Sequence, residues 1–195
     1  MEYLEPILLK DGRLCILRSG TDADGEAALE NFIRTHEQTD YLLSYPDEIR
    51  FTAAEEGEFL RKKTESADEV EILAEVDGKI IGLAGIGRVG GYEKVARRAE
   101  FGVSVDREYW GLGVGRALTR ACIACAKRAG YAQLELDVVA DNERAAALYR
   151  SEGFVVYGTN PRGFYSRLTG WQPLTLMRLE LDDVSIPESR STETV

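Results

Sequence analysis

The sequence predicts an α/β fold with one mixed sheet that carries helices on both faces. Two observations predict it. First, residues 70–76, 79–89 and 98–105 follow one another with the alternation of strands, which indicates antiparallel neighbours. Second, strands and helices alternate further along the chain, which is typical of a sheet covered on both faces. A length of 195 residues fits a single domain with one core.

The first third of the chain is expected to form one strand and two helices. Residues 13–18 alternate as a strand does, and Thr21 or Asp22 would cap a helix through ALENFIRTH. Residues 38–51 mix aromatic residues with a proline and predict a loop or a broken helix. The capping-box pattern Thr-x-x-Glu then predicts a second helix, AAEEGEFLRKKTES.

Turn signals and hydrophobic periodicity predict the later elements. Asp77-Gly78 lies between two predicted strands and is the strongest short hairpin signal. Asn142 would cap a helix that stops at Gly153. The remaining predicted elements are a loop at 90–96, a helix at 111–130, strands at 134–139 and 154–158, a loop at 159–172 and a final strand at 173–181. The prediction is about seven strands in a domain at 1–182, with a disordered tail at 183–195.

Net charge narrows the partners. Asp and Glu number 34 against 24 Lys and Arg, a formal net charge of −10. Such a chain would repel a phosphate backbone, so we expect no nucleic-acid partner. A cationic substrate fits this acidic field better than an anionic one, although negative charge also serves solubility alone. No apolar run approaches the roughly 20 residues that cross a bilayer, and no signal peptide opens the chain. We therefore expect no membrane partner and a cytoplasmic protein.

The cysteines are expected to be structural. Cys122 and Cys125 form a C-x-x-C pattern, which redox centres and zinc sites also use. They continue an apolar helical stripe with Leu118 and Ala121, and the chain has no second such pair and a single histidine. Burial in the core is therefore favoured over metal or redox chemistry.

The most informative segment is VSVDREYWGLGVGRAL. Gly111, Gly113 and Gly115 stand between a predicted strand and a predicted helix, where glycine lets the backbone approach a ligand closely. Free N–H groups and the positive end of the helix dipole would make a cradle for phosphate or pyrophosphate. Arg116 and Arg120, one turn apart, either assist a bound anion or are ordinary solvated arginines. The spacing matches neither the P-loop nor the dinucleotide fingerprint, which disfavours nicotinamide cofactors.

A second signal lies downstream, in LDVVADNERAAALYRSEGF. Asn142 stands at a strand-to-helix turn and Tyr149 lies two helical turns later, so both side chains can reach one cleft. Capping would explain Asn142 alone, and core packing would explain Tyr149 alone. Together with the glycine turn, the two residues favour a ligand site.

The two segments resemble the GNAT superfamily, the acyl-CoA-dependent N-acetyltransferases. The resemblance covers about residues 13–182 and is most specific at 97–158. EYWGLGVGRAL is similar to the family's pyrophosphate loop, with Trp110 where Gln or Arg is commonest, and DNERAAALYRSEGF resembles its second signature. The resemblance implies a mostly antiparallel mixed sheet that is splayed in the middle, and acetyl-CoA as co-substrate with no metal.

The resemblance also implies a role for each matching residue. Backbone N–H groups from about Leu112 to Arg116 would hold the CoA pyrophosphate. Residues 103–105 would pair with the pantetheine like an extra strand, and the Val105 N–H would polarise the thioester carbonyl. Asn142 would bond the pantetheine. The implied cofactor-binding residues are Val103, Ser104, Val105, Trp110, Gly111, Leu112, Gly113, Val114, Gly115, Arg116 and Asn142.

Two residues are candidate catalytic groups. Tyr149 would protonate the leaving thiolate, since a phenol pKa of about 10 suits proton exchange with an alkyl thiol. Glu100 occupies the place where some members carry a catalytic glutamate, and strand alternation turns it away from Phe101. A salt bridge to Arg88 or Arg98 is the alternative for Glu100, and ordered water would then serve as the base.

The resemblance implies an N-acetyltransferase that moves an acetyl group from acetyl-CoA directly to a primary amine of a small molecule. A free amino acid, a polyamine or aminoglycoside, or a protein N-terminus would serve as acceptor, and a homodimer is left open. A CoA-binding regulatory module without catalysis is the alternative from another class. The segments expected to face the acceptor are 34–51 and 159–172, with Tyr41, Tyr45, Phe164 and Tyr165.

Overall fold

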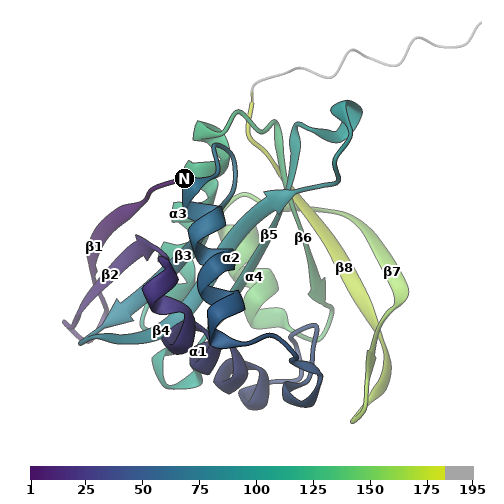
Figure 1. Ribbon diagram of the computed structural model, residues 1–195. Coiled ribbons are helices and arrows are strands. Elements are labelled where there is room, and N and C mark those ends of the chain that lie inside the picture. The colour runs from purple at the N-terminus through teal and green to yellow at the C-terminus, as the bar shows by residue number, and fades with distance from the viewer. Residues whose placement is uncertain (183–195) are drawn as a thin grey trace, which may run out of the picture.

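The computed structural model describes residues 1–182, which form one open sheet with helices on both faces (Figure 1). The strands are β1 (Leu4–Leu8), β2 (Leu14–Ser19), β3 (Val70–Val76), β4 (Lys79–Arg88), β5 (Arg98–Val105), β6 (Gln133–Val139), β7 (Val155–Ser166) and β8 (Gly170–Glu180). The helices are α1 (Gly25–Gln38), α2 (Ala53–Glu65), α3 (Val114–Arg128) and α4 (Glu143–Ser151). The predicted fold class is confirmed. The tail predicted at 183–195 lies outside the described residues.

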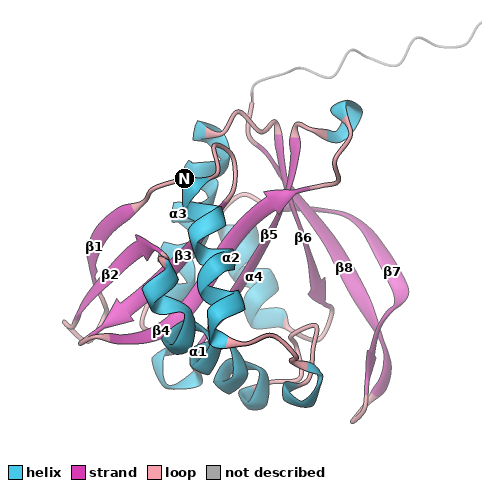
Figure 2. Cartoon of the chain, in the orientation of Figure 1, coloured by secondary structure: helices cyan, strands magenta, loops and turns pink. Residues whose placement is uncertain are grey.

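The sheet has eight strands, one more than the sequence indicates, and a longer C-terminal hairpin. The sequence does not predict β1, which pairs antiparallel with β2 at one edge. The loop predicted at 159–172 is wrong, because those residues form the second half of β7 and the start of β8 (Figure 2). Register shifts between Asn160 and Phe164 break the alternation there, and a proline and a glycine lie within the irregular stretch.

The sheet is split in its middle, as the resemblance implies. Its strand order is β1-β2-β3-β4-β5-β6-β8-β7, and β5 with β6 is the parallel pair in it. That pairing covers Arg98 to Glu100 of β5 against Gln133 to Glu135 of β6 and then stops. The later parts of β5 and β6 diverge, which Figure 1 shows as an opening above α4.

Each sheet face carries its own pair of helices. On one face α1 and α2 pack Ala28 and Leu60 onto Leu73 and Leu83. The other face carries the larger core, in which α3 and α4 cover alternate residues of the same strands. Glycine at 25 and 57 allows α1 and α2 to meet closely, because a methyl group at either would overlap backbone atoms of the neighbouring segment.

Local signals place several element ends as the sequence predicts. Thr52 caps α2 by accepting a hydrogen bond from the Glu55 N–H at 3.3 Å, and Asp77-Gly78 turns β3 into β4. Cys122 and Cys125, on the buried face of α3, are 0% and 1% exposed. The described residues contain no group of side chains arranged to hold a metal. In the part of the chain described here, no helix is long and apolar enough to span a membrane.

Candidate active site

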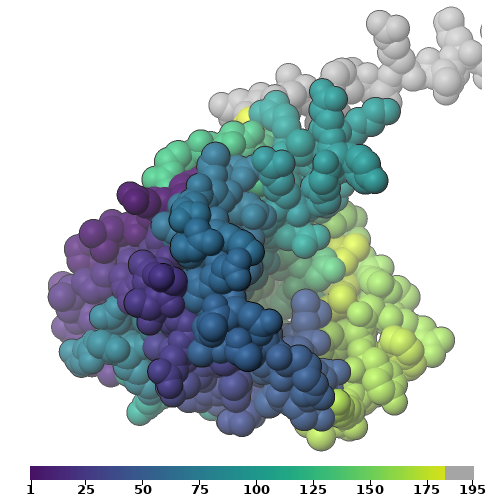
Figure 3. Space-filling model, in the orientation of Figure 1, coloured from purple at the N-terminus to yellow at the C-terminus, as the bar shows by residue number. Residues whose placement is uncertain are grey.

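A cleft of about 1610 Å³ runs through the opening between β5 and β6 and continues beneath α2. Figure 3 shows the surface hollowed between the α2 side of the molecule and the β7–β8 hairpin. The predicted site residues that line the cleft are Glu100, Val103, Ser104, Val105, Trp110, Gly111, Gly115, Asn142 and Tyr149. One cleft thus brings together most residues of the two sequence segments that predict the site.

The glycine turn presents a row of free donors at the start of α3. Gly111 and Gly113 have φ of +86° and +103°, a left-handed backbone that other residues resist. Gly113 is the N-cap of α3, so the helix begins three residues later than the sequence predicts. From Gly113 to Arg116, no backbone N–H has an acceptor among the described residues. Four consecutive free N–H groups and the positive end of the helix dipole suit a pyrophosphate.

The free edge of β5 faces the opening. The Asp106 N–H, directly after β5, donates to the Ile81 carbonyl oxygen on β4 at 2.9 Å. This bond shows which residues of β5 direct their backbone N–H and C=O groups toward β4. Successive residues direct their N–H and C=O groups to opposite edges, so Val105 and Val103 direct theirs away from β4, into the opening. The Val105 carbonyl oxygen accepts a hydrogen bond from the Trp110 indole, and the rest of this edge, including the Val105 N–H, is open to pairing with an extended ligand.

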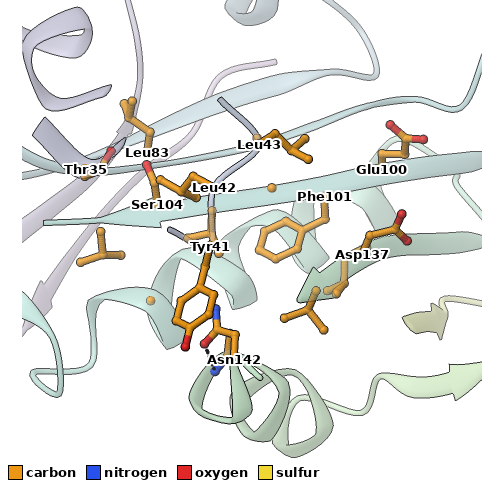
Figure 4. Close-up of a pocket in the computed structure, with 18 of the residues that line it drawn as sticks. Thr35, Tyr41, Leu42, Leu43, Leu83, Glu100, Phe101, Ser104, Asp137 and Asn142 are labelled. Atoms are coloured by element: carbon orange, nitrogen blue, oxygen red, sulfur yellow. Dashed lines mark hydrogen bonds between the residues drawn. The ribbon is translucent and has the colours of Figure 1, made fainter. Parts of the chain in front are cut away.

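Asn142 has a structural role and also lines the cleft. Its Oδ1 accepts a hydrogen bond from the Ala145 N–H at 3.2 Å and caps α4. Tyr41, from the segment after α1, lines the same cleft, and Figure 4 labels both residues. The cap fixes the asparagine side chain at the edge of the cleft, where its amide nitrogen has no acceptor among the described residues.

Tyr149 is held rigidly behind the opening. Its ring meets Phe101 edge-on with centroids 6.0 Å apart, and Phe154 lies 5.9 Å away. Its side chain is 8% exposed, and its hydroxyl has no hydrogen-bond partner within residues 1–182. Burial raises the pKa of Tyr149 to about 12, so the phenol keeps its proton throughout the neutral range.

Glu100 lines the cleft and makes no salt bridge with any residue of the described range 1–182. Arg98 pairs instead with Glu135 at 2.6 Å, and Arg88 pairs with Asp68. Opposite Gly87 of β4, the Glu100 side chain points to the face that carries α1 and α2. The salt-bridge alternative for Glu100 is therefore not what the structure contains.

The structure adds two carboxyl groups that the sequence analysis misses. Asp137 of β6 lines the cleft, and Figure 4 shows its carboxyl group on the same side as that of Glu100. Burial, and secondly the charge of Glu135, raise the pKa of Asp137. Glu71 of β3 lines the cleft beneath α2. The alternation of LELDVV turns Asp137 away from its apolar neighbours, and this pattern could have identified Asp137 from the sequence. The burial of Glu71 depends on a helix far away in the sequence and could not be identified in this way.

Several predicted residues lie elsewhere. Arg120 and Arg116 both approach Glu152 near the end of α4, at 2.8 and 3.5 Å, so their side chains are paired within the protein. Tyr41 and Phe164 line the cleft, as expected for residues that face an acceptor. Two others, Tyr45 and Tyr165, are not part of its lining. Tyr45 instead accepts a hydrogen bond from the backbone N–H at 167 (2.6 Å) and joins the segment after α1 to the β7–β8 turn.

A split mixed sheet with free donors at the following helix and a tyrosine behind the split defines the fold of the acyl-CoA-dependent acetyltransferases. Residues 29–154 match the acetyltransferase (GNAT) family, and the chain belongs to that family. Its members use acetyl-CoA as the acetyl donor.

Known relatives and structures agree with this assignment. The chain is 39% identical over 101 residues to the N-alpha-acetyltransferase RimI of Mycobacterium tuberculosis, which covers 52% of this chain and 60% of that protein. It is 27% identical over 118 residues to the L-amino acid N-acyltransferase MnaT of Escherichia coli, covering 60% of this chain and 68% of the relative. A GNAT-family acetyltransferase structure from Streptococcus pneumoniae superposes with a TM-score of 0.81 at 27% identity, over 85% of this chain and 99% of that one.

Proposed function

We propose that this protein is an N-acetyltransferase that moves the acetyl group of acetyl-CoA directly to a primary amine of a small molecule. The observation that carries the proposal is the row of four free N–H groups at the start of α3, beside an opening that exposes the edge of β5. A ligand with a pyrophosphate and an extended, amide-containing arm satisfies both features at once. CoA is such a ligand.

In the proposed complex, the free backbone donors from Gly113 to Arg116 hold the pyrophosphate, whereas the Leu112 N–H, expected from the sequence to join them, donates to the Tyr109 carbonyl oxygen at 3.4 Å. Residues 103–105 pair with the pantetheine arm. The amide nitrogen of Asn142, which has no acceptor among the described residues and lines the cleft, would bond the same arm. The Val105 N–H points into the opening, where it would donate to the thioester carbonyl. A donor aimed at the oxygen that becomes negative in the transition state contributes roughly 3–4 kcal/mol in other enzymes.

The proposed reaction is a direct transfer. The neutral amine nitrogen attacks the thioester carbonyl carbon, and the resulting tetrahedral intermediate breaks its C–S bond. Tyr149 gives its phenolic proton to the departing sulfur, while the nitrogen loses a proton to Glu100, to Asp137 or to ordered water. Tyr149 then regains a proton from solvent. The phenol is protonated at neutral pH, as this role requires.

The names of the relatives point to two acceptor classes, and the proposal commits to one of them. The mycobacterial relative is named as an N-alpha-acetyltransferase and the E. coli relative as an amino-acid acyltransferase. We favour a small amine, because residues 41–44 after α1 line the cleft and the following residues are hydrogen-bonded to the β7–β8 turn, which narrows the room for a protein substrate. The cytoplasm, expected from the sequence, stays a prediction.

The test is a panel of acceptors with purified protein and acetyl-CoA. The panel holds amino acids, diamines, an aminoglycoside and short peptides with free N-termini. Thiol release and mass spectrometry of the acceptor report turnover, and calorimetry separately reports CoA binding. Thiol release with an acceptor heavier by one acetyl group supports the proposal. CoA binding without turnover on any acceptor would instead indicate a binding module without catalysis.

A further inference from the structure

Glu71 extends its carboxyl group across the neighbouring strand. It faces Gly85 of β4, which in turn faces Gly102 of β5, so the three residues form one row on the face that carries α1 and α2. A methyl group at Gly85 would overlap the Glu71 carboxyl group. The glycine therefore provides the space that this side chain occupies, and the carboxyl group lies over β4 on the way to the opening in the sheet.

The Glu71 carboxyl group has no partner of its own. No hydrogen-bond donor and no cation within 4.0 Å contact it among residues 1–182. Lys63 of α2, the nearest basic residue, pairs with Glu69 at 3.2 Å and lies over Gly87 instead. Glu56, also on α2, is buried nearby and carries the same charge sign. A half-buried carboxyl group that lines a cleft without a partner is a candidate ligand contact.

The sheet surface between Glu71 and the opening, formed by Gly85 and Gly102, carries no side chain that would block a ligand. Nothing lies within 4 Å of the position that a Cβ of Gly102 would occupy. Glu100 and Ser104 flank Gly102 along β5 on the same face, and both line the cleft. Adjacent strands lie about 4.8 Å apart, so the Glu71 carboxyl group is roughly one to two strand spacings, or 5–10 Å, from the opening.

We infer that Glu71 binds a second positive centre of the acceptor, and that the acceptor is a diamine or polyamine whose other amine is acetylated at the opening. This inference rests on the proposed function and names its substrate class. An alkyl chain of four or five carbons between two nitrogens would extend over Gly102 and Gly85, from the opening to Glu71. The alkyl part would lie against Leu83 and the aromatic residues of α1 and α2 that line the cleft, Phe32 and Phe59.

Charge around this row favours a dication over an amino acid. Beneath α2 the cleft is lined by Glu55, Glu56 and Glu71, and by two cations that are already paired, Lys63 with Glu69 and Arg88 with Asp68. An acceptor carboxylate would meet mostly like charge there. Burial raises the pKa of Glu71 to about 8, with Glu56 adding to the shift and Lys63 opposing it. The empty site is thus largely protonated at neutral pH and would release a proton when an ammonium group binds.

The experiment compares putrescine, a four-carbon diamine, with n-butylamine, which has the same chain and one amine. Both are assayed with acetyl-CoA for kcat/KM and, in the presence of CoA, for binding by calorimetry in two buffers of different ionisation enthalpy. The variant is Glu71→Gln, which keeps the side-chain shape. The matched control is Glu58→Gln, which removes a carboxylate from an exposed position on α2, where Glu58 pairs with Lys62.

The expected result is a preference for putrescine of about tenfold or more, lost in Glu71→Gln and kept in Glu58→Gln. Putrescine binding should also release protons from the wild type and not from Glu71→Gln. Equal use of both amines by the wild type, or a preference that survives Glu71→Gln, would overturn the inference while leaving acetyl transfer intact. Putrescine binding that depends on Glu71, without turnover of any acceptor, would support the site and contradict the proposed function.

Discussion

The indole Nε1 of Trp110 donates a hydrogen bond of 2.7 Å to the carbonyl oxygen of Val105. This bond ties the glycine turn to the last residue of β5, whose N–H faces the opening. Guanidinium groups of Arg107 and Arg144 lie 5.5 and 5.0 Å from the Trp110 ring. The sequence resemblance matches Trp110 to a position of the pyrophosphate loop, and the structure shows that its side chain makes a hydrogen bond within the protein.

We expect Trp110→Phe to weaken CoA binding by roughly fivefold, since a net hydrogen bond contributes about 1 kcal/mol and holds the β5 edge in place here. Calorimetry with CoA measures the effect. Trp171→Phe, at an exposed position on β8, is the control and should leave the affinity unchanged. If Trp110→Phe bound CoA as tightly as the wild type, the tie would have no part in forming the site.

The glycine turn should be required for CoA binding. Gly113→Val places a branched side chain where φ is +103° and beside the free N–H groups, so CoA binding should be lost. Gly130→Val is the matched control: it lies at the other end of α3, has φ of +80° and is equally open around its Cβ position. Both variants should lose about 1–2 kcal/mol of stability from backbone strain. Normal CoA affinity in a folded Gly113→Val protein would refute the pyrophosphate assignment.

Cys122 and Cys125 should be chemically inert. Both lie on the buried face of α3, and burial raises the pKa of each thiol, so neither is a thiolate at neutral pH. Substitution of either by alanine should cost about 1 kcal/mol of unfolding free energy through lost packing and leave turnover unchanged. Denaturant unfolding and steady-state kinetics measure the two effects. An acetylated cysteine detected by mass spectrometry during turnover would contradict direct transfer.

The charge state of Glu71 should make stability depend on pH. Its pKa is raised on folding to about 8, so the folded protein holds a proton that the unfolded chain has lost. This contribution is complete below the unfolded pKa, near 4.5, and is lost as pH rises to about 8. Between pH 5 and 8 the Tm of the wild type should therefore fall relative to that of Glu71→Gln. A constant difference in Tm across this range would show that Glu71 is already ionised or well solvated.

The sequence predicts the site better than it predicts the sheet edges. The glycines from 111 to 115 and the Asn142 cap are local signals, because they depend on turns and helix ends. By contrast, β1 is a five-residue edge strand with a proline at its centre, and β7 contains Pro161 within its irregular half. Pairing with neighbours far along the chain stabilises both strands, and no local pattern records that pairing.

The burial of Glu71 has the same kind of origin. In the sequence Glu71 is a polar residue in the strand VEILAEV. Alternation predicts which residues share a face of the sheet with Glu71, but it does not predict what covers that face. The covering comes from α2 and the space from Gly85, residues on two other elements. The alternation of β5 correctly predicts that Glu100 and Phe101 lie on opposite faces of the sheet. Which of the two faces borders the cleft is known only from the fold.

The central claim is acetyl transfer in the opening of the sheet, and Tyr149 tests it most directly. Tyr149→Phe removes the hydroxyl and keeps the ring packed against Phe101 and Phe154. Tyr131→Phe is the matched control, because it removes a tyrosine hydroxyl that is buried without a hydrogen-bond partner in residues 1–182, at a residue that does not line the cleft. Single-turnover kinetics with the best acceptor of the panel isolates the chemical step.

We expect Tyr149→Phe to lower the rate of acetyl transfer by about 10²–10³ while the Kd for acetyl-CoA changes little, and Tyr131→Phe to change neither. The loss belongs to a group that acts in the transition state, so kcat and kcat/KM should fall together. A Tyr149→Phe protein that transfers acetyl at the wild-type rate, with the chemical step measured directly, would contradict the account.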